Sequence, residues 1–263
     1  MNLYALHAGD SPLLIDVPHA GTYLPPEIAA RLTPIARTVP DTDWHVDKLY
    51  AFARAAGATL LAATHSRIVV DLNRDPSGAA LYPGADNTEL CPTRTFANDP
   101  VYAGAGAPGS AEIVARRARY FDPYHAVLER EIERIRGRHG HVVLLDGHSI
   151  RAEVPRFFAG RLPDLNLGTA GGTSCASGVE AVAAGILASA ARFTHVVNGR
   201  FKGGYVTRRY GQPERGVHAL QLEMAQCTYM DEAPPYRWDA QRAAALGAVL
   251  VRLVDALAAW RPE

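Results

Sequence analysis

The stretch HVVLLDGHSI, residues 141–150, decides the fold class. Four consecutive apolar residues stand in it without polar alternation, and the run then ends in Asp146, Gly147 and His148. Such a run is typical of a central strand that is covered on both faces. In sheets built from these strands, ligands bind beyond the carboxyl ends of the strands. The sequence therefore predicts a buried strand over 141–145, followed by polar residues at the end where sites form.

The rest of the chain alternates between predicted strands and helices. Apolar or alternating runs predict strands over 13–17, 59–64, 67–72, 195–197 and 216–225. Helical spacing of apolar residues predicts helices over 25–32, 43–56, 112–136, 178–191 and 238–260. The third of these helices should kink near Pro123. The segments predicted to be irregular, rich in glycine and other loop-forming residues, are 75–110 and 198–210.

This order of elements predicts an α/β fold. Strands separated by helices favour a mostly parallel or mixed central sheet with helices on both faces, which is a three-layer α/β/α arrangement. The sequence contains no internal repeat and no long low-complexity linker. We therefore expect a single domain over residues 1–263.

Charge and cysteine content exclude several classes of protein. Lysine and arginine number 27, as do aspartate and glutamate, so the net charge is zero and no nucleic acid or anionic membrane surface is expected as a partner. Three well-separated cysteines without a CxxC pair disfavour a disulfide framework or a cysteine zinc site. The chain starts without a signal peptide pattern and lacks an apolar run of about 18 residues. A cytoplasmic protein is expected, and its oligomeric state is left open.

Two histidines stand at the ends of predicted buried strands. His148 follows the strand over 141–145, and His19 follows the strand over 13–17. Either histidine alone can be a hydrogen-bonding residue at a strand end. Together, at one edge of a sheet, the two imidazoles can converge on a metal ion, with Zn²⁺ the first choice and another divalent transition metal possible.

A third metal ligand should be an acid. The stretch DTDWHVD, residues 41–47, offers Asp41, Asp43 and Asp47. We select Asp43, at the start of the predicted helix, and keep Asp47 and Asp41 as alternatives. A plain helix cap with solvated acids is the competing interpretation.

Glu223 is the candidate general base. The strand over 216–225 alternates, so that Leu222 and Met224 point to one face and Glu223 to the other, among small and polar residues. A carboxylate placed in this way tends to have a raised pKa, as a general base requires. The competing interpretation is a surface ion pair on an edge strand.

Several cations could hold an anionic substrate. Arginine grips carboxylates through two parallel hydrogen bonds, and glycine lets a loop approach a ligand closely. The candidates for substrate binding are Arg67, Asn73, Arg74, Arg208, Arg209 and Gly204. They indicate a small substrate with more than one carboxylate. Alternatively, Arg67 and Arg74 form structural pairs with nearby aspartates.

Nucleophilic catalysis is the weaker alternative. Ser149, Ser174 and the cysteines offer possible nucleophiles, but the sequence lacks a GxSxG elbow.

Taken together, these stretches resemble the N-formylglutamate amidohydrolase (deformylase) family. The resemblance spans nearly the whole chain, in order, and rests on VPHAG (17–21), DTDW (41–44), SRIVVDLNR (66–74), DGHS (146–149), PDLNLG (163–168), NGRFKGGY (198–205) and QLEMAQ (221–226).

The resemblance implies a zinc-carboxypeptidase-like catalytic domain. It also implies hydrolysis of N-formyl-L-glutamate to L-glutamate and formate, the last step of one bacterial route of histidine breakdown. Related enzymes carry an acidic ligand three residues after the first histidine, whereas Thr22 stands there in this sequence. The choice of Asp43 is therefore an inference and not a motif match. Asn73 and Arg74 correspond by analogy to a pair that holds the substrate carboxylate.

Two alternative functions stay open. One is an amidohydrolase for another N-acyl acidic amino acid, such as N-formylaspartate. The other is a non-catalytic protein that binds a metal or an amino acid.

Overall fold

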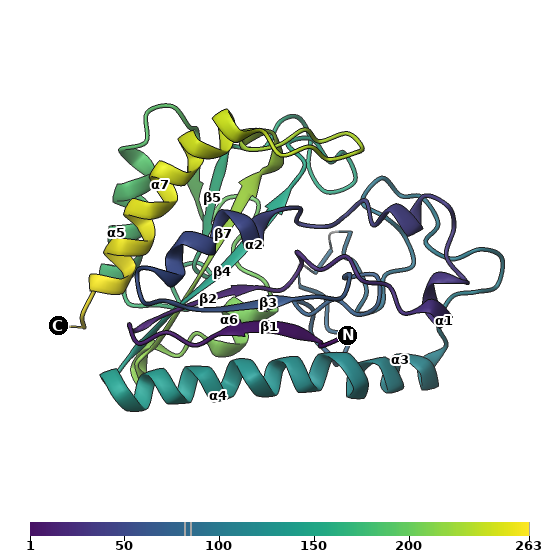
Figure 1. The fold of residues 1–263 in the computed structure, drawn as a ribbon, viewed down its shortest axis with the longest axis horizontal. Coiled ribbons are helices and arrows are strands. Elements are labelled where there is room, and N and C mark those ends of the chain that lie inside the picture. Colours follow the sequence, from purple (N-terminus) through teal and green to yellow (C-terminus); the bar gives the residue numbers. More distant parts are fainter. Residues whose placement is uncertain (82, 85, 263) are drawn as a thin grey trace.

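The structure, a computed structural model, describes residues 1–81, 83–84 and 86–262. Within these residues, seven strands form one sheet in the order β1–β3–β2–β4–β7–β5–β6 (Figure 1). Their bounds are β1 (Tyr4–His7), β2 (Leu13–Val17), β3 (Thr59–Ala63), β4 (Val142–Ile150), β5 (Leu165–Gly168), β6 (His195–Val197) and β7 (Val217–Ala225).

The sheet is mixed, with a parallel centre. Strands β3, β2, β4 and β7 run parallel to one another, whereas β1 is antiparallel to β3 and β5 is antiparallel to β7. Strand β6 runs parallel to β5. The carboxyl ends of the four central strands therefore meet at one edge. The predicted mostly parallel or mixed sheet is confirmed.

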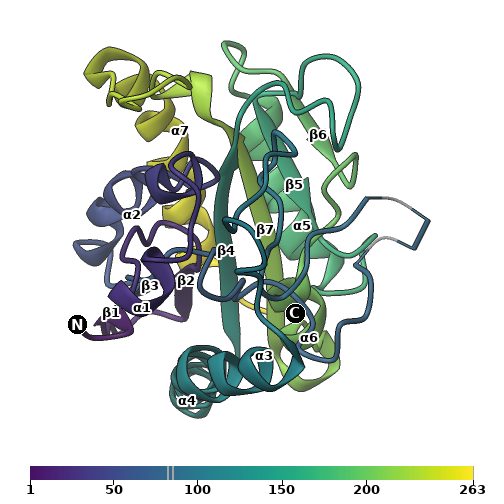
Figure 2. The same ribbon diagram turned by 90° about the vertical axis from the view of Figure 1, so that its right-hand side faces the viewer.

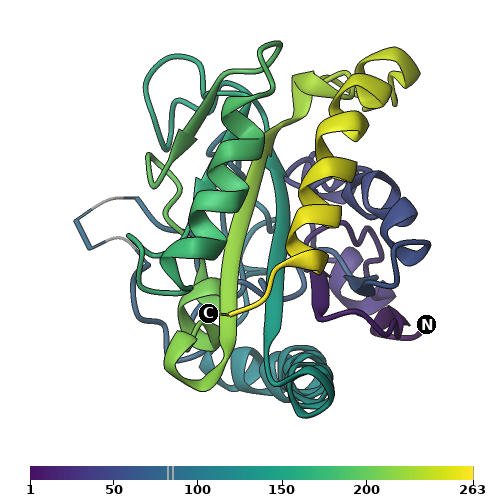
Figure 3. The same cartoon turned by 90° about the vertical axis from the view of Figure 1, so that its left-hand side faces the viewer.

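Helices cover both faces of this sheet. They are α1 (Pro26–Ala29), α2 (Val46–Leu49), α3 (Ser110–Arg116), α4 (Asp122–His139), α5 (Ser177–Ala188), α6 (Tyr205–Tyr210) and α7 (Ala240–Ala259). Buried residues of α2, α5 and α7 form one apolar core with one face of the sheet, and those of α4 and α6 form a second core with the other. Figure 3 shows α5 and α7 side by side over the first face. The predicted three layers are confirmed.

Strand β4 is longer than predicted. The apolar run ends at Leu145, but the backbone stays paired with β7 as far as Ile150, so Asp146 and His148 lie inside the strand and not after it. Pairing with β2 reaches only Asp146. Beyond that level β4 and β7 continue together as far as Ile150 and Ala225 (Figure 2).

Gly147 is required inside β4 because the ring of Tyr50 packs against it. A Cβ atom at this position would lie 2.7 Å from Cε2 of the Tyr50 ring.

Three predictions of local structure are wrong. The segment 198–210 is predicted to be irregular, but Tyr205–Tyr210 form helix α6. The helix over 43–56 is a short helix, α2, followed by a 3₁₀ turn over Ala51–Arg54. It starts only after His45, whose left-handed backbone (φ 64°) separates Asp43 from the helix. Residues 67–72 form turns and not a strand, because β3 already pairs with β1 and β2 on its two edges. Their apolar side chains are buried in the second core without pairing.

The helix predicted over 112–136 is interrupted near Pro123. A π-helical turn over Arg117–Phe121 separates α3 from α4, and Pro123 stands in the first turn of α4. A proline ring clashes with the carbonyl four residues earlier, which interrupts a regular helix. In the segment 75–110, predicted to be irregular, the described residues up to Gly109 contain neither helix nor strand, and Ser110 begins α3; positions 82 and 85 lie outside the described residues.

No helix among the described residues combines the length and the apolar character needed to span a bilayer.

Candidate functional site

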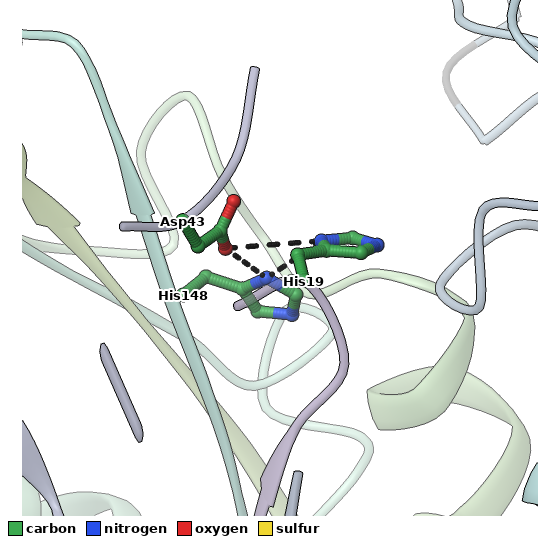
Figure 4. A group of neighbouring side chains, drawn as sticks. All are labelled: His19, Asp43 and His148. Carbon is green, nitrogen blue, oxygen red and sulfur yellow. Dashed lines mark hydrogen bonds and ion pairs between the residues drawn. The ribbon is translucent and has the colours of Figure 1, made fainter. Parts of the chain in front are cut away.

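His19, Asp43 and His148 come together at the carboxyl edge of the sheet, although each lies on a different segment (Figure 4). Nδ1 of His148 lies 3.0 Å from Oδ2 of Asp43 and 3.2 Å from Nδ1 of His19. Nδ1 of His19 lies 3.8 Å from the same Asp43 oxygen. All three side chains are buried. The site is therefore a compact group of two imidazole nitrogens and one carboxylate oxygen.

Backbone hydrogen bonds hold these segments together. The chain leaves β2 after Val17, and the N–H of Asp43 donates to the carbonyl of His19 at 3.1 Å. The N–H of Ser149, at the end of β4, donates to Oδ2 of Asp43 at 3.1 Å. Because Asp43 does not cap a helix, its carboxylate is available to the two histidines.

Two further carboxylates lie behind the histidines. Nε2 of His19 lies 2.8 Å from Oδ1 of Asp71, and Nε2 of His148 lies 2.8 Å from Oδ1 of Asp146. The amide nitrogen of Asn73 lies 2.8 Å from Nε2 of His148 and donates to Oδ2 of Asp146 at 3.1 Å, so it lies between the imidazole and the carboxylate. Carboxylates placed in this way orient histidines that bind a metal through the other nitrogen.

The residues present fit a small divalent cation. Tetrahedral zinc with bonds near 2.1 Å brings its ligand atoms about 3.4 Å apart, and the three distances here, 3.0, 3.2 and 3.8 Å, lie around that value. Three electron-rich atoms this close repel one another unless a proton or a cation lies between them. The donor set of two nitrogens and one oxygen suits zinc and other divalent transition metals.

The charges of the group are coupled. Burial alone would raise the pKa of Asp43, but hydrogen bonds with His148 and His19 outweigh it and hold that pKa below its ordinary value. Burial would lower the pKa of His148, but Asp146 and Asp43 outweigh it and raise that pKa well above its usual range. The pair therefore attracts positive charge, either as a proton or as a metal ion.

Arg67 neutralises two of the surrounding acids. Its guanidinium donates to Oδ2 of Asp71 at 2.7 Å and to Oδ1 of Asp43 at 3.4 Å. The charges of Arg67 and Arg74 outweigh burial and hold the pKa of Asp71 well below its ordinary value. Arg67 therefore forms the structural pair with a nearby aspartate that was the alternative interpretation, and it also lies beside the site.

Glu223 lies next to His148 on the neighbouring strand, since the two Cα atoms are register partners in the β4–β7 pair. It is 7% exposed, and Gln221 donates to its Oε2 at 3.3 Å. Burial, followed by the charge of Asp43 and opposed by that of His148, raises the pKa of Glu223 to about 8. Such a carboxyl can take up and release a proton near neutral pH.

A cavity with an interior of about 70 Å³ opens between these groups. It is lined by the three clustered residues and by Glu223 and Gln221. Cationic, amide, hydroxyl and aromatic side chains complete the wall, among them Arg67, Asn73, Arg74, Asn87, Thr88, Phe96, Phe157, Arg200 and Phe201. Gly204 also lines it. The irregular segment over 75–110 thus supplies part of the wall.

Arg208 and Arg209 do not line this cavity. Arg208 donates to the carbonyls of Gly203 and Leu81, and Arg209 lies 3.6 Å from Glu129 on the surface. The cation that the loop contributes to the cavity is instead Arg200, which is not among the residues predicted from the sequence. Arg200 could have been selected from the sequence because it directly follows Asn198-Gly199, in a stretch that carries the family resemblance.

The alternative residues lie elsewhere. Asp41 accepts a hydrogen bond from the N–H of Phe96, and burial raises its pKa to about 6. Asp47 is exposed on α2. The hydroxyl of Ser149 accepts a hydrogen bond from Tyr229, and that of Ser174 donates to the carbonyl of Ala219.

Comparisons with known proteins identify the family. The sequence model of the family described as N-formylglutamate amidohydrolase matches residues 11–230. The chain is 48% identical to the N-formylglutamate deformylase of Pseudomonas aeruginosa, over 97% of this chain and 96% of that protein. It is 44% identical to the N-formylglutamate deformylase of Pseudomonas putida, over 98% and 97% respectively.

A solved structure has the same fold. The crystal structure of N-formylglutamate amidohydrolase from Ralstonia eutropha JMP134 superposes with a TM-score of 0.82 at 28% identity and covers 98% of this chain and 97% of that one. The chain belongs to the N-formylglutamate amidohydrolase family.

Proposed function

We propose that this protein hydrolyses N-formyl-L-glutamate to L-glutamate and formate, with a divalent metal ion, Zn²⁺ in the first place, held by His19, Asp43 and His148. The observation that carries the proposal is the buried group of these three side chains, with ligand atoms within 4.8 Å of one another, next to a cavity that Glu223 also lines. Family membership and the names of the two Pseudomonas relatives supply the substrate.

A divalent cation in this group would act as a Lewis acid, polarising a carbonyl oxygen and making water more acidic. The protein's own residues then handle the proton. Glu223, with its raised pKa, accepts a proton from the attacking water and delivers it to the nitrogen of the leaving amine. Buried Asp71 and Asp146 keep His19 and His148 oriented during this exchange.

Substrate recognition falls to the cations of the cavity wall. Arg74 and Arg200 line the cavity, and we assign to them the two carboxylates of the substrate, with Arg67 adding positive charge beside the site. Asn73 also supports the site itself. Its Oδ1 accepts a hydrogen bond from the N–H of Val206, and its Nδ2 donates one to Asp146.

The experiment is formate release from a panel of N-acyl amino acids, each measured with and without a chelator. We expect N-formylglutamate to be the best substrate, a chelator to abolish turnover, and Zn²⁺ to restore it. Faster release from N-formylaspartate would support the alternative acidic substrate. Absence of formate from every N-formyl amino acid, in protein shown to contain metal, would overturn the proposal.

We also infer that the reaction ends a route of histidine breakdown, as the family resemblance implies. Deletion of the gene in its host should abolish growth on histidine as the nitrogen source and lead to accumulation of N-formylglutamate. Normal growth without accumulation would contradict this setting while leaving the enzymatic activity in place.

A further inference from the structure

The start of helix α6 holds two side-chain amides of the site. The N–H of Gly204, just before the helix, donates to Oε1 of Gln221 at 2.7 Å, and the N–H of Val206 donates to Oδ1 of Asn73 at 2.8 Å. The first N–H groups of a helix lack partners within the helix, so they are free to bind such oxygens. Both amides line the cavity.

These hydrogen bonds fix the direction of each amide. A backbone N–H can only donate, so it selects the oxygen of the amide and turns the NH₂ group to the opposite side. For Gln221, which is 4% exposed, the NH₂ group then faces Oε2 of Glu223 at 3.3 Å. The alternating geometry of β7 places Gln221 and Glu223 on the same face, two residues apart. The orientation of Gln221 therefore reaches the Glu223 carboxylate directly.

The contact between α6 and the site is close. A Cβ atom at Gly204 would lie 2.4 Å from the Asn73 amide, so only glycine lets the backbone approach in this way. The N–H that orients Gln221 thus belongs to a residue packed against the site itself.

Other charged groups also act on Glu223. His148 and Asp146 belong to β4, Asp43 to the loop before α2, and Arg67 to the turn after β3; all four influence its carboxyl group. From β5, Asn166 donates to the backbone carbonyl of Glu223 and not to its side chain. In addition to these charges, Gln221 supplies an uncharged hydrogen-bond donor to the Glu223 carboxylate, and the orientation of this donor is fixed.

We propose that Gln221 is a positioning residue for Glu223, which it holds through a hydrogen bond whose direction is set by the N–H of Gly204. The inference rests on the proposed function, because it assumes that Glu223 is the general base. It connects the glycine-containing segment before α6 to the group that moves the proton.

Two variants test the connection. Gln221→Glu retains an oxygen for the N–H of Gly204 but cannot donate to Glu223 when ionised, whereas Gln221→Met removes both hydrogen bonds at similar length. We expect kcat to fall by about 10- to 100-fold in both, as is usual for residues that support a metal site, with KM and metal content unchanged. The acid limb of kcat/KM should move to higher pH, because a carboxylate that loses a donor is harder to ionise.

A second measurement does not require turnover. Carboxyl ¹³C NMR of the metal-loaded protein, with the Glu223 signal assigned from its absence in Glu223→Gln, should show a higher pKa for Glu223 in both Gln221 variants, and the larger increase in Gln221→Glu. Wild-type protein that releases no formate would remove the proposed function, and this titration would still decide whether Gln221 acts on Glu223.

The matched control is Gln241→Met, the same substitution at an exposed position of α7. It should leave kcat, the pH profile and the NMR titration unchanged. An unshifted Glu223 pKa in Gln221→Glu, or a loss of activity no larger than the loss of bound metal, would overturn the proposal.

Discussion

His148 and Glu223 lie side by side as register partners on the parallel strands β4 and β7, two residues beyond Asp146, where the pairing between β4 and β2 ends. Their separation is therefore set by the hydrogen-bond ladder of the sheet and not by a loop. The candidate metal ligand and the candidate base therefore both lie on inner strands of the sheet. Segments that carry His19 and Asp43 then fold over the end of β2 to complete the group.

Replacing the base should separate catalysis from metal binding. In Glu223→Gln the side chain keeps its size but cannot accept a proton, so kcat should fall by about 10²- to 10⁴-fold while bound metal stays at the wild-type level. Formate release and metal analysis measure the two quantities. Glu214→Gln, at an exposed position, is the control and should be fully active. Near-normal turnover in Glu223→Gln would remove Glu223 from the mechanism.

Loss of a ligand should release the metal. His148→Ala removes one of the three donor atoms and exposes two buried acids to each other, so we expect metal affinity to fall by more than about 100-fold, beyond the effect of losing a supporting residue. Metal content after dialysis and a competition titration would measure it. His195→Ala, on the exposed side of β6, should retain the metal. Full occupancy in His148→Ala would show that the ligand set is wrong.

The pH profile should report the ionisation of Glu223. Burial raises its pKa from 4.5 to about 8, and a bound cation nearby pulls it back down. The base must be ionised, so kcat/KM should be low in acid and rise with pH through an inflection between these two values. The residual activity of Glu223→Gln should lack this limb. A wild-type profile that is flat from pH 4.5 to 8 speaks against Glu223 as the titrating base.

Substitutions of Arg200 and Arg209 should differ in their effect on KM. Arg200→Met removes a charged donor from the cavity wall, and a charged hydrogen bond contributes about 1.5–3 kcal/mol, so KM should rise roughly 10- to 100-fold. Arg209 pairs with Glu129 outside the cavity, so Arg209→Met should leave KM unchanged. Steady-state kinetics on N-formylglutamate provide the comparison. Equal effects of the two substitutions would mean that the loop approaches the substrate differently.

Gly147 should be irreplaceable for steric reasons. In Gly147→Ala the new methyl group meets the buried Tyr50 ring, and overpacking of this kind costs about 1–3 kcal/mol of unfolding free energy. Gly137→Ala in α4, where nothing lies within 4 Å of the new Cβ, should instead stabilise the protein by about 0.5–1 kcal/mol. Urea denaturation of both variants measures the opposite signs. Equal stabilities would mean that Tyr50 moves aside freely.

The central strands could be predicted because a buried strand has a local sequence pattern, a short run of apolar residues. Apolar runs over 13–17 and 141–145 are covered on both faces wherever they lie in the sheet, and β2 and β4 contain them. The face of Glu223 follows from alternation along β7 in the same way. The polar end of β4 could not be read as strand, since Asp146 and His148 remain in the ladder only because β7 continues beside them.

Elements without such a local signature were mispredicted. The run over 67–72 has the apolar composition of a strand, but β3 has no free edge to pair with it, so it folds into turns that place Arg67 and Asp71 at the site. Helical spacing suggested a helix from Asp43, whereas the left-handed backbone at His45 ends the helix early and leaves the Asp43 carboxylate to the histidines.

By itself, the sequence determined the layered α/β fold, the family, and the kinds of residue available for chemistry, because these depend on residue type and on periods of two or of 3.6 along the chain. Only the tertiary structure decided which of Asp41, Asp43 and Asp47 joins the histidines, and that Arg200 rather than Arg208 or Arg209 lines the cavity. Those choices depend on where loops end in space, which is set by pairing and packing between residues more than a hundred positions apart.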